Sequence, residues 1–477
     1  MVLEDLVVGQ VRSQLGPAHY TRPDRERQIL RRHRTWPHRA RASSLAPPAL
    51  PPPCPTHRPS ATARPFLENS PSFPPVFSWP RLARSLYRRH QRGPLRARRW
   101  LHERRRLRRL HLRQRLRPFS KRFGTGSGGI VEVEVVTADG QIRIANAHQN
   151  ADLFFALRGG GGTFGIATRV TLLTHPIPDT VGIITGSVQA KSDRAYRELI
   201  QRFVEFYPHA LDNPTWGESV AFGPDNSLGF RLTFLDRPLE LAQADMDGLV
   251  EPLRARPDDF EVAPAYRFLP FRDLWNPAYW DAHEPGFITR DPRPDAPDHQ
   301  FWWSGNQGEV SVFWNSYQSR WIPTALMKES PARLAGALFA ASRLRPFIFQ
   351  INKGLSGEHP EARARDEQTA LHPQAFDAAA LVIMASAQRQ RYRGVAGREP
   401  DLEASRHDRD QASQAMAAIA AVTPGAGCYS TEADYFLKDW QQSQWGENYP
   451  RLLAIKQTYD PTNLFHVRHG VGSEHAT

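Results

Sequence analysis

Apolar and polar residues alternate along residues 130–136, IVEVEVV, where valine recurs at every second position from Val131 to Val135. A period of two residues is typical of a strand with one buried face. Asp139-Gly140 then supplies the residues that a tight turn favours, and a second alternating stretch starts at residue 141. The pattern therefore predicts a β-hairpin over residues 130–147.

A short helix, a glycine run and another strand are predicted after the hairpin. ADLFFALR, residues 151–158, opens after Asn150 and is followed by Gly159–Gly162, which favours the end of a helix. IATRVTLLTHPI, residues 166–177, follows directly and has the β-branched composition of a strand.

The middle of the chain mixes both periodicities. Amphipathic helical patterns at residues 192–207 and 330–344 interleave with β-rich stretches at 308–317 and 347–355. This interleaving predicts the α+β class.

The C-terminal stretch 447–465 reads as a helix with Leu452, Leu453 and Ile455 inward, and Asp460-Pro461 ends it.

The N-terminal segment, residues 1–117, has a different composition. It combines proline clusters with an arginine-rich tract at 98–117, and such a sequence favours extended, disordered chain. Residues 1–122 hold 29 of the 62 Lys+Arg and 6 of the 49 Asp+Glu, a net of 29 − 6 = +23. The remaining 33 basic and 43 acidic residues give 33 − 43 = −10, so the total of +13 comes from the first quarter.

Three interpretations of this segment remain open. It could be a basic arm that binds nucleic acid or an anionic membrane, a solvated disordered tail, or a stretch that is not a selected protein sequence at all. The start of the chain has no apolar run typical of a signal peptide, so the localisation is left open. Two cysteines, Cys54 and Cys428, exclude a disulfide framework.

Two glycine motifs have the spacing G-x-G-x-x-G, at residues 124–129 and 160–165. A dinucleotide-binding fingerprint needs a strand before the glycines and a helix after them, and neither motif has that order. Glycine still lets successive backbone N–H groups approach a phosphate, because no Cβ stands in the way. A tight helix-to-strand connection without a ligand is the alternative.

Longer stretches carry a family resemblance. SKRFGTGSGGIVEVEVVTADG, ANAHQNADLFFALRGGGGTFGIATRVTLLTHP and the C-terminal YSTEADYFLKDWQQSQWGENYPRLLAIKQTYDPTNLF resemble the berberine bridge enzyme-like FAD-linked oxidases of the vanillyl-alcohol-oxidase type. The resemblance implies a PCMH-type FAD-binding domain whose second subdomain is residues 118–180. An antiparallel-sheet substrate domain would span 181–427, and residues 428–477 would return to the flavin.

The family's chemistry implies an activity and a set of site residues. A relative of this kind oxidises an alcohol, a sugar or a secondary metabolite by hydride transfer to flavin N5, usually with molecular oxygen as acceptor, and no protein partner is inferred. The residues that the resemblance places at the cofactor are Gly160, Gly161, Thr163, Phe164, Gly165, Ile166, Val135 and Asn448. Tyr429 would accept the substrate proton, although a core tyrosine is the alternative, and Gln350 and Asn352 would face the substrate from one side of a strand.

The departures from the family matter as much as the match. Intact members begin with a subdomain that carries a glycine-rich pyrophosphate loop and often a covalent histidine or cysteine, and residues 1–117 resemble neither. The flavin linkage is therefore unknown, and we expect an incomplete flavin domain, weak FAD binding and an artefactual or degenerate N-terminus. An inactive oxidase-like protein with a nucleic-acid- or membrane-binding basic arm is the alternative. A metal site at His466, His469 and His475 is not predicted, because no carboxylates complete a ligand pattern.

Overall fold

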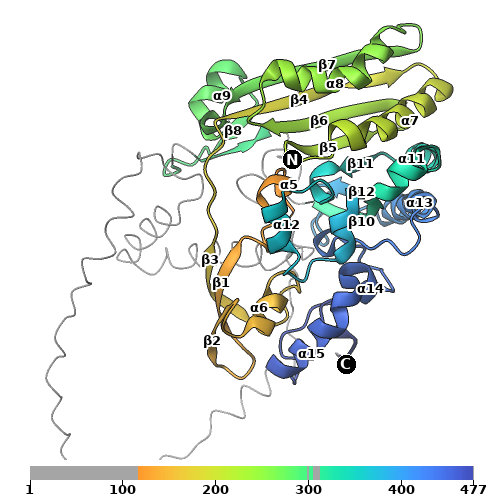
Figure 1. Ribbon diagram of the computed structural model, residues 1–477. Coiled ribbons are helices and arrows are strands. Elements are labelled where there is room, and N and C mark those ends of the chain that lie inside the picture. The colour runs from red at the N-terminus through yellow and green to blue at the C-terminus, as the bar shows by residue number, and fades with distance from the viewer. Residues whose placement is uncertain (1–115, 298–299, 305–311, 476–477) are drawn as a thin grey trace, which may run out of the picture. The chain divides into compact units, whose positions relative to one another are not determined.

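The computed structural model describes residues 116–475, apart from 298–299 and 305–311 (Figure 1). All described elements belong to one of the two compact units of the chain. The disorder predicted for residues 1–117 falls almost entirely outside the described part of the chain, as does the start of the strand predicted at 308–317.

A three-stranded antiparallel sheet confirms the predicted hairpin. Its order is β2-β1-β3, and a short helix precedes the third strand. The elements are α5 (Ser120–Phe123), β1 (Ile130–Val136), β2 (Ile142–Asn146), α6 (Ala151–Leu157) and β3 (Ile166–Leu172). The alternation fails at one end, because Val131 is 49% exposed where Val133 and Val135 are buried. A register shift between Ile130 and Glu132 turns the strand there.

A seven-stranded antiparallel sheet forms the middle of the chain, in the order β10-β12-β11-β5-β6-β4-β7. Its strands are β4 (Thr180–Ala190), β5 (Trp216–Phe222), β6 (Ser227–Leu235), β7 (Phe260–Pro270), β10 (Val312–Pro323), β11 (Phe347–Gln350) and β12 (Ala378–Arg389). Both sheets are antiparallel and are joined to helices, so the predicted α+β class is confirmed.

Helices cover one face of this large sheet. They are α7 (Asp193–Ala210), α8 (Leu239–Arg254), α10 (Thr324–Glu329), α11 (Pro331–Leu344) and α13 (Leu402–Ala420). Figure 1 shows α7 and α8 running along the same face, and their apolar side chains share one core with those of the strands. Ser192 caps α7, since its side chain accepts a hydrogen bond from the N–H of Ala195 at 3.2 Å.

Shorter elements fill the ends of the large sheet. An aromatic cluster around Trp280 and Trp303 joins α9 (Pro277–His283) to the small hairpin of β8 (Ile288–Arg290) and β9 (Phe301–Trp303). Other short pieces are η2 (Phe271–Trp275), η4 (Ile351–Lys353), α12 (Pro360–Asp366), η5 (Pro373–Asp377) and η6 (Ser430–Glu432). No helix in the described ranges is long and apolar enough to span a membrane.

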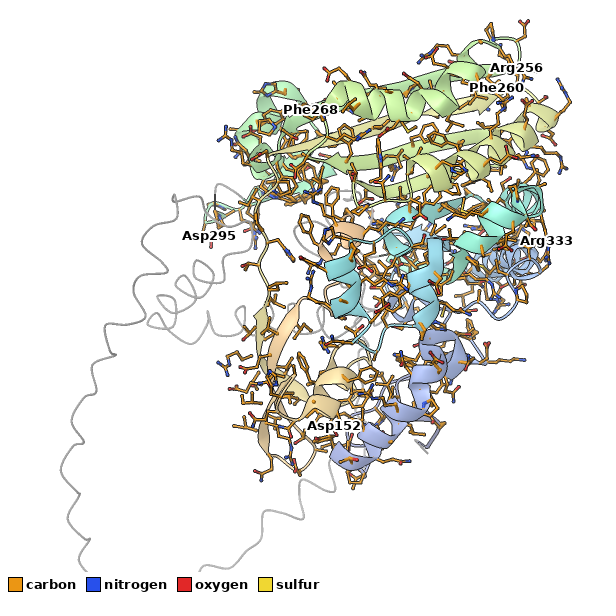
Figure 2. The ribbon with its side chains drawn as sticks, in the orientation of Figure 1. Asp152, Arg256, Phe260, Phe268, Asp295 and Arg333 are labelled. Carbon is orange, nitrogen blue, oxygen red and sulfur yellow. The ribbon has the colours of Figure 1, made fainter. Side chains whose placement is uncertain are left out.

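The C-terminal helices pack against the small sheet. They are α14 (Trp440–Trp445) and α15 (Tyr449–Tyr459), joined by η7 (Gly446–Asn448), with η8 (Ser473–His475) at the end. Their apolar side chains and those of β1, α6 and β3 form a single core, in which Leu452 and Ile455 are buried. Asp152, labelled in Figure 2, accepts a hydrogen bond from the hydroxyl of Tyr459 at 3.0 Å. The two ends of the described chain therefore share one core.

Candidate functional site

The glycine loop between α6 and β3 has a backbone that only glycine adopts easily. The φ angles of Gly159, Gly161 and Gly165 are 119°, 92° and 150°. A Cβ atom at Gly161 or Gly162 would meet nothing within 4 Å, so this side of the loop is open.

The open side of the loop carries unused hydrogen-bond donors. Nothing in the described part of the chain accepts a hydrogen bond from the backbone N–H groups of Gly161, Gly162 or Thr163. The hydroxyl of Thr163 is buried and likewise has no partner among the described residues. Backbone donors without Cβ atoms in the way suit an anionic ligand, so the loop fits the diphosphate of FAD.

The closed side of the loop is held by the C-terminal helices. Trp445 Nε1 donates to the carbonyl of Gly159 at 3.0 Å, and Lys456 Nζ donates to that of Thr163 at 2.8 Å. Lys456 also pairs with Asp460, and both side chains are almost fully buried. The loop is therefore fixed from one side and open on the other.

The remaining residues predicted at the cofactor lie in four kinds of place. Val135 and Phe164 are fully buried in the core of the small sheet, so only their backbone could meet a ligand. Ile166 is 54% exposed. Asn448 is half-buried, and its amide donates to the carbonyl of Leu371 at 2.8 Å. Gly160 and Gly165 are closely packed, since a Cβ would lie 2.5 Å and 2.6 Å from carbonyl oxygens.

Tyr429 lies in a second polar cluster, on the face of the large sheet opposite the helices. It is buried, and its hydroxyl accepts a hydrogen bond from the N–H of Leu116 at 3.4 Å. Lys353 Nζ lies 5.7 Å from the centre of its ring, and Glu432 holds that ammonium group at 2.8 Å. Burial raises the pKa of Tyr429, and the charge of Glu432 raises it further, while Lys353 lowers it.

One prediction about the substrate side is wrong. Gln350 and Asn352 do not lie on one strand, because β11 ends at Gln350 and Asn352 lies in the 3₁₀ helix η4. A 3₁₀ turn has three residues, so positions two apart no longer share a face.

Both side chains are nevertheless buried and polar. The amide nitrogen and oxygen of Asn352 have no hydrogen-bond partner among the described residues, and the amide oxygen of Gln350 has none either. Gln350 lies opposite Leu381 on β12, and Leu381 lies opposite Trp321 on β10, so the three side chains share one face of the sheet. The indole N–H of Trp321 also has no partner within the described ranges. Unsatisfied buried polar atoms are rare in folded proteins, and a bound ligand is one way in which they become satisfied.

Sequence reasoning missed Lys353, Glu432 and Trp321. A signal for two of them was present, because Lys353 follows the predicted Asn352 directly and Glu432 comes three residues after Tyr429. The contact between Lys353 and Glu432 could not be predicted without knowing the register of the sheet.

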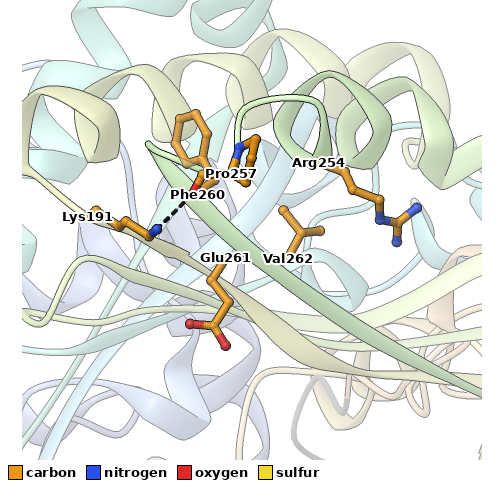
Figure 3. A pocket seen from close by; sticks show the side chains of 6 residues that line it. All are labelled: Lys191, Arg254, Pro257, Phe260, Glu261 and Val262. Atoms are coloured by element: carbon orange, nitrogen blue, oxygen red, sulfur yellow. Dashed lines mark hydrogen bonds between the residues drawn. The ribbon is translucent and has the colours of Figure 1, made fainter.

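Two surface pockets lie elsewhere. Figure 3 shows a pocket of about 360 Å³ where Lys191 meets the start of β7, with Lys191 Nζ bonded to the carbonyl of Pro257 at 2.7 Å. Another, of about 380 Å³, is lined by the C-terminal residues Trp440, His466, Val467, Arg468, His469, Ser473 and Glu474. No group of histidine, cysteine and carboxylate side chains in the described ranges could hold a metal ion.

Solved structures place this architecture in a known class. The VAO-type flavoprotein MtVAO615 from Myceliophthora thermophila C1 matches with a TM-score of 0.59 and 25% identity, over 76% of this chain and 61% of that one. The carbohydrate oxidase from Microdochium nivale matches with a TM-score of 0.54 and 19% identity, over 76% and 70%. The fold is therefore that of the VAO-type flavoproteins.

Sequence comparisons add the family. Residues 428–472 match the family described as berberine and berberine like. FAD-linked oxidoreductase notD of an Aspergillus species is 31% identical over 355 residues, which is 72% of this chain and 51% of the relative. An uncharacterised FAD-linked oxidoreductase of Arthroderma benhamiae is 28% identical over 74% of this chain and 56% of the relative. The chain is similar to berberine bridge enzyme-like FAD-linked oxidoreductases, and it spans about half the length of the curated relatives it matches.

Proposed function

We propose that this chain supplies one wall of the FAD site and the substrate-facing sheet of an FAD-linked oxidoreductase. The glycine loop carries the proposal, because its open side combines unused N–H donors with missing Cβ atoms. The proposed substrates are small alcohols, sugars or secondary metabolites, with molecular oxygen as final acceptor. The carbohydrate oxidases among the similar structures make sugars the first class to test.

FAD, when bound, would supply the two-electron acceptor at flavin N5. The chain's own residues would bind the cofactor and orient the substrate. Gly161 and Gly162 would donate backbone N–H groups to the diphosphate, while Gln350 and Asn352 would orient the substrate through their unsatisfied amide atoms. Tyr429 would exchange a proton with the substrate hydroxyl, since it lies on the same sheet face.

We also propose that this chain binds FAD weakly. The donors that the described residues offer to the diphosphate come from one loop, so few contacts would hold the cofactor. Purified protein that is bright yellow, with one flavin per chain by absorbance, would overturn this part of the proposal.

A glycine-to-alanine pair tests the loop. Gly162→Ala adds a methyl group on the open side without a clash, so the fold should persist while FAD affinity falls by about tenfold, the effect of about 1.4 kcal/mol. Gly336→Ala is the matched control, because Gly336 lies in α11 and its Cβ would also meet nothing within 4 Å. Equilibrium dialysis with FAD up to millimolar concentration measures both variants. Equal affinity in both, or no FAD bound by the wild-type chain, would contradict the proposed site.

A catalytically inactive oxidase-like protein is the second candidate. The contact between Leu116 and the Tyr429 hydroxyl favours it, because that hydroxyl would have to meet the substrate. Hydrogen peroxide release by FAD-supplemented protein, measured over a panel of alcohols and sugars, distinguishes the two candidates.

A further inference from the structure

Three elements bring charged and polar groups together around Tyr429. Lys353, at the end of η4, contacts both carboxylate oxygens of Glu432 in η6, each at 2.8 Å. The hydroxyl of Tyr317 on β10 donates to the same carboxylate at 3.3 Å. Lys353 is 5% exposed at its side chain and Glu432 is 18% exposed, so water screens this pair poorly.

We propose that Glu432 is a positioning residue that holds Lys353 and Tyr317 beside Tyr429 and, by engaging the ammonium group of Lys353, opposes ionisation of the Tyr429 hydroxyl. This inference rests on the proposed function, because it concerns the same substrate-facing cluster. Glu432 would thereby set the pH above which Tyr429 can accept the substrate proton.

A count of buried charges gives the reason. With Glu432 and Lys353 both ionised and Tyr429 neutral, the cluster carries no net charge. Loss of the tyrosine proton would leave one uncompensated negative charge in a buried site, which is unfavourable. If Glu432 were neutral, the same ionisation would instead form a pair between the tyrosinate and Lys353.

The other groups that face Tyr429 do not change this count. Leu116 offers a backbone N–H to the hydroxyl at 3.4 Å, and the hydroxyl of Thr431 also favours the ionised form. Ser319 Oγ accepts from the backbone N–H of Tyr429 at 3.2 Å. None of the three carries a charge, so Glu432 and Lys353 decide the protonation state of the tyrosine.

Replacement of Glu432 by glutamine tests the inference on the full-length chain. Glu432→Gln keeps the size and one acceptor for Lys353, so the fold should be retained. We expect the ionisation constant of the Tyr429 hydroxyl to rise about tenfold or more, because the pairing with Lys353 becomes available. Alkaline titration by NMR of ¹³Cζ-labelled tyrosine, with Tyr429→Phe to assign the signal, measures it without any flavin.

Two further variants separate positioning from a merely structural role. Glu432→Asp restores the charge and should return the titration towards that of the wild-type chain. The double variant Lys353→Met with Glu432→Gln should lose the tenfold effect, since no cation remains to pair with the tyrosinate. Glu329→Gln, an exposed carboxylate on α10, is the control for loss of one charge.

Each outcome of these experiments either supports or overturns the role proposed for Glu432. A Tyr429 titration in Glu432→Gln that matches the wild-type chain would overturn the inference, as would an unchanged tenfold effect in the double variant. If every variant lacks FAD binding and turnover while the titration shifts as expected, the proposed function fails and the role of Glu432 stands. If the protein turns over, its rate in Glu432→Gln should rise at a lower pH than in the wild-type chain.

Discussion

Gly160 and Gly162 lie two positions apart in the glycine loop and have opposite surroundings. A Cβ at Gly160 would lie 2.5 Å from the carbonyl oxygen of Ala156 and 2.8 Å from a methyl group of Leu452, whereas one at Gly162 would meet nothing. The first glycine is needed for packing and the second leaves space for a ligand.

Gly160→Ala should therefore destabilise the protein by about 1–3 kcal/mol, because backbone and core atoms must shift to admit the methyl group. Gly162→Ala should be neutral or stabilising by up to about 1 kcal/mol. Urea unfolding followed by circular dichroism gives both values. Equal stability of the two variants would show that the loop packs differently.

His372 predicts how stability depends on pH. It is buried, its Nδ1 accepts from the N–H of Gln374 at 3.1 Å, and its Nε2 lies 3.2 Å from the carbonyl of Gln442. Burial lowers the pKa of His372 to about 4, because the charged ring is poorly solvated, although the contact with Gln442 opposes the shift.

The unfolded chain takes up this proton near pH 6.5 and the folded chain only near pH 4, so stability falls as the pH drops through that window. The loss should reach about 3 kcal/mol at most. His372→Asn keeps an acceptor for Gln374 and should flatten this part of the curve, while the exposed control His407→Asn should not. Urea unfolding from pH 7 to pH 4 provides the comparison.

Part of the site could be predicted residue by residue and part could not. The backbone conformation of the glycine loop could be predicted, because a run of glycines signals its backbone freedom in the sequence itself. Glu432 was missed because its importance comes from the contact with Lys353, a residue 79 positions away. Such a pair depends on the register of β10, β11 and β12, which no local pattern encodes.

Periodicity predicted the existence of elements better than their ends. The hairpin at β1 and β2 was found because turn residues and alternation agree. The strand expected from residue 347 to 355 stops at Gln350, since η4 continues the chain with a different period. The exposed Val131 is a similar case, because a bulge changes which face a residue takes without changing the sequence pattern.

A buried ion pair joins Lys456 in α15 to Asp460, the residue that follows the helix, and its loss should be costly. Lys456 Nζ donates to Asp460 and to the carbonyls of Thr163 and Phe465, at 2.8 Å and 2.7 Å for the carbonyls. Lys456→Met would leave the carboxylate of Asp460 buried without its cation, which costs about 3–5 kcal/mol. The double variant with Asp460→Asn should recover part of this loss. Thermal unfolding of the two variants measures it, and a single variant as stable as the double would contradict the pairing.

At the scale of the whole molecule, the large sheet and its helices share one core, and an exposed loop of the chain lies outside that core. Residues 391–399 are exposed and contain Gly394 and Gly397, both with positive φ. On either side, β12 and α13 place buried side chains in the same core.

Cleavage in this loop should therefore leave the protein assembled. A recognition site for a sequence-specific protease, inserted between Gly394 and Gly397, should yield two fragments that elute together on gel filtration and separate only in denaturant. Fragments that separate without denaturant would mean that α13 is held by the loop and not by the core.

The shared core of the small sheet and the C-terminal helices determines when, during synthesis, this part of the protein can finish folding. About 270 residues separate the end of β3 at Leu172 from the start of α14 at Trp440. At synthesis rates of roughly 5–20 residues per second, the β1–β3 sheet leaves the ribosome about 15–50 seconds before its partner helices exist. During that interval the helices that cover its apolar face are not yet made, so this core can close only after the last residues are synthesised.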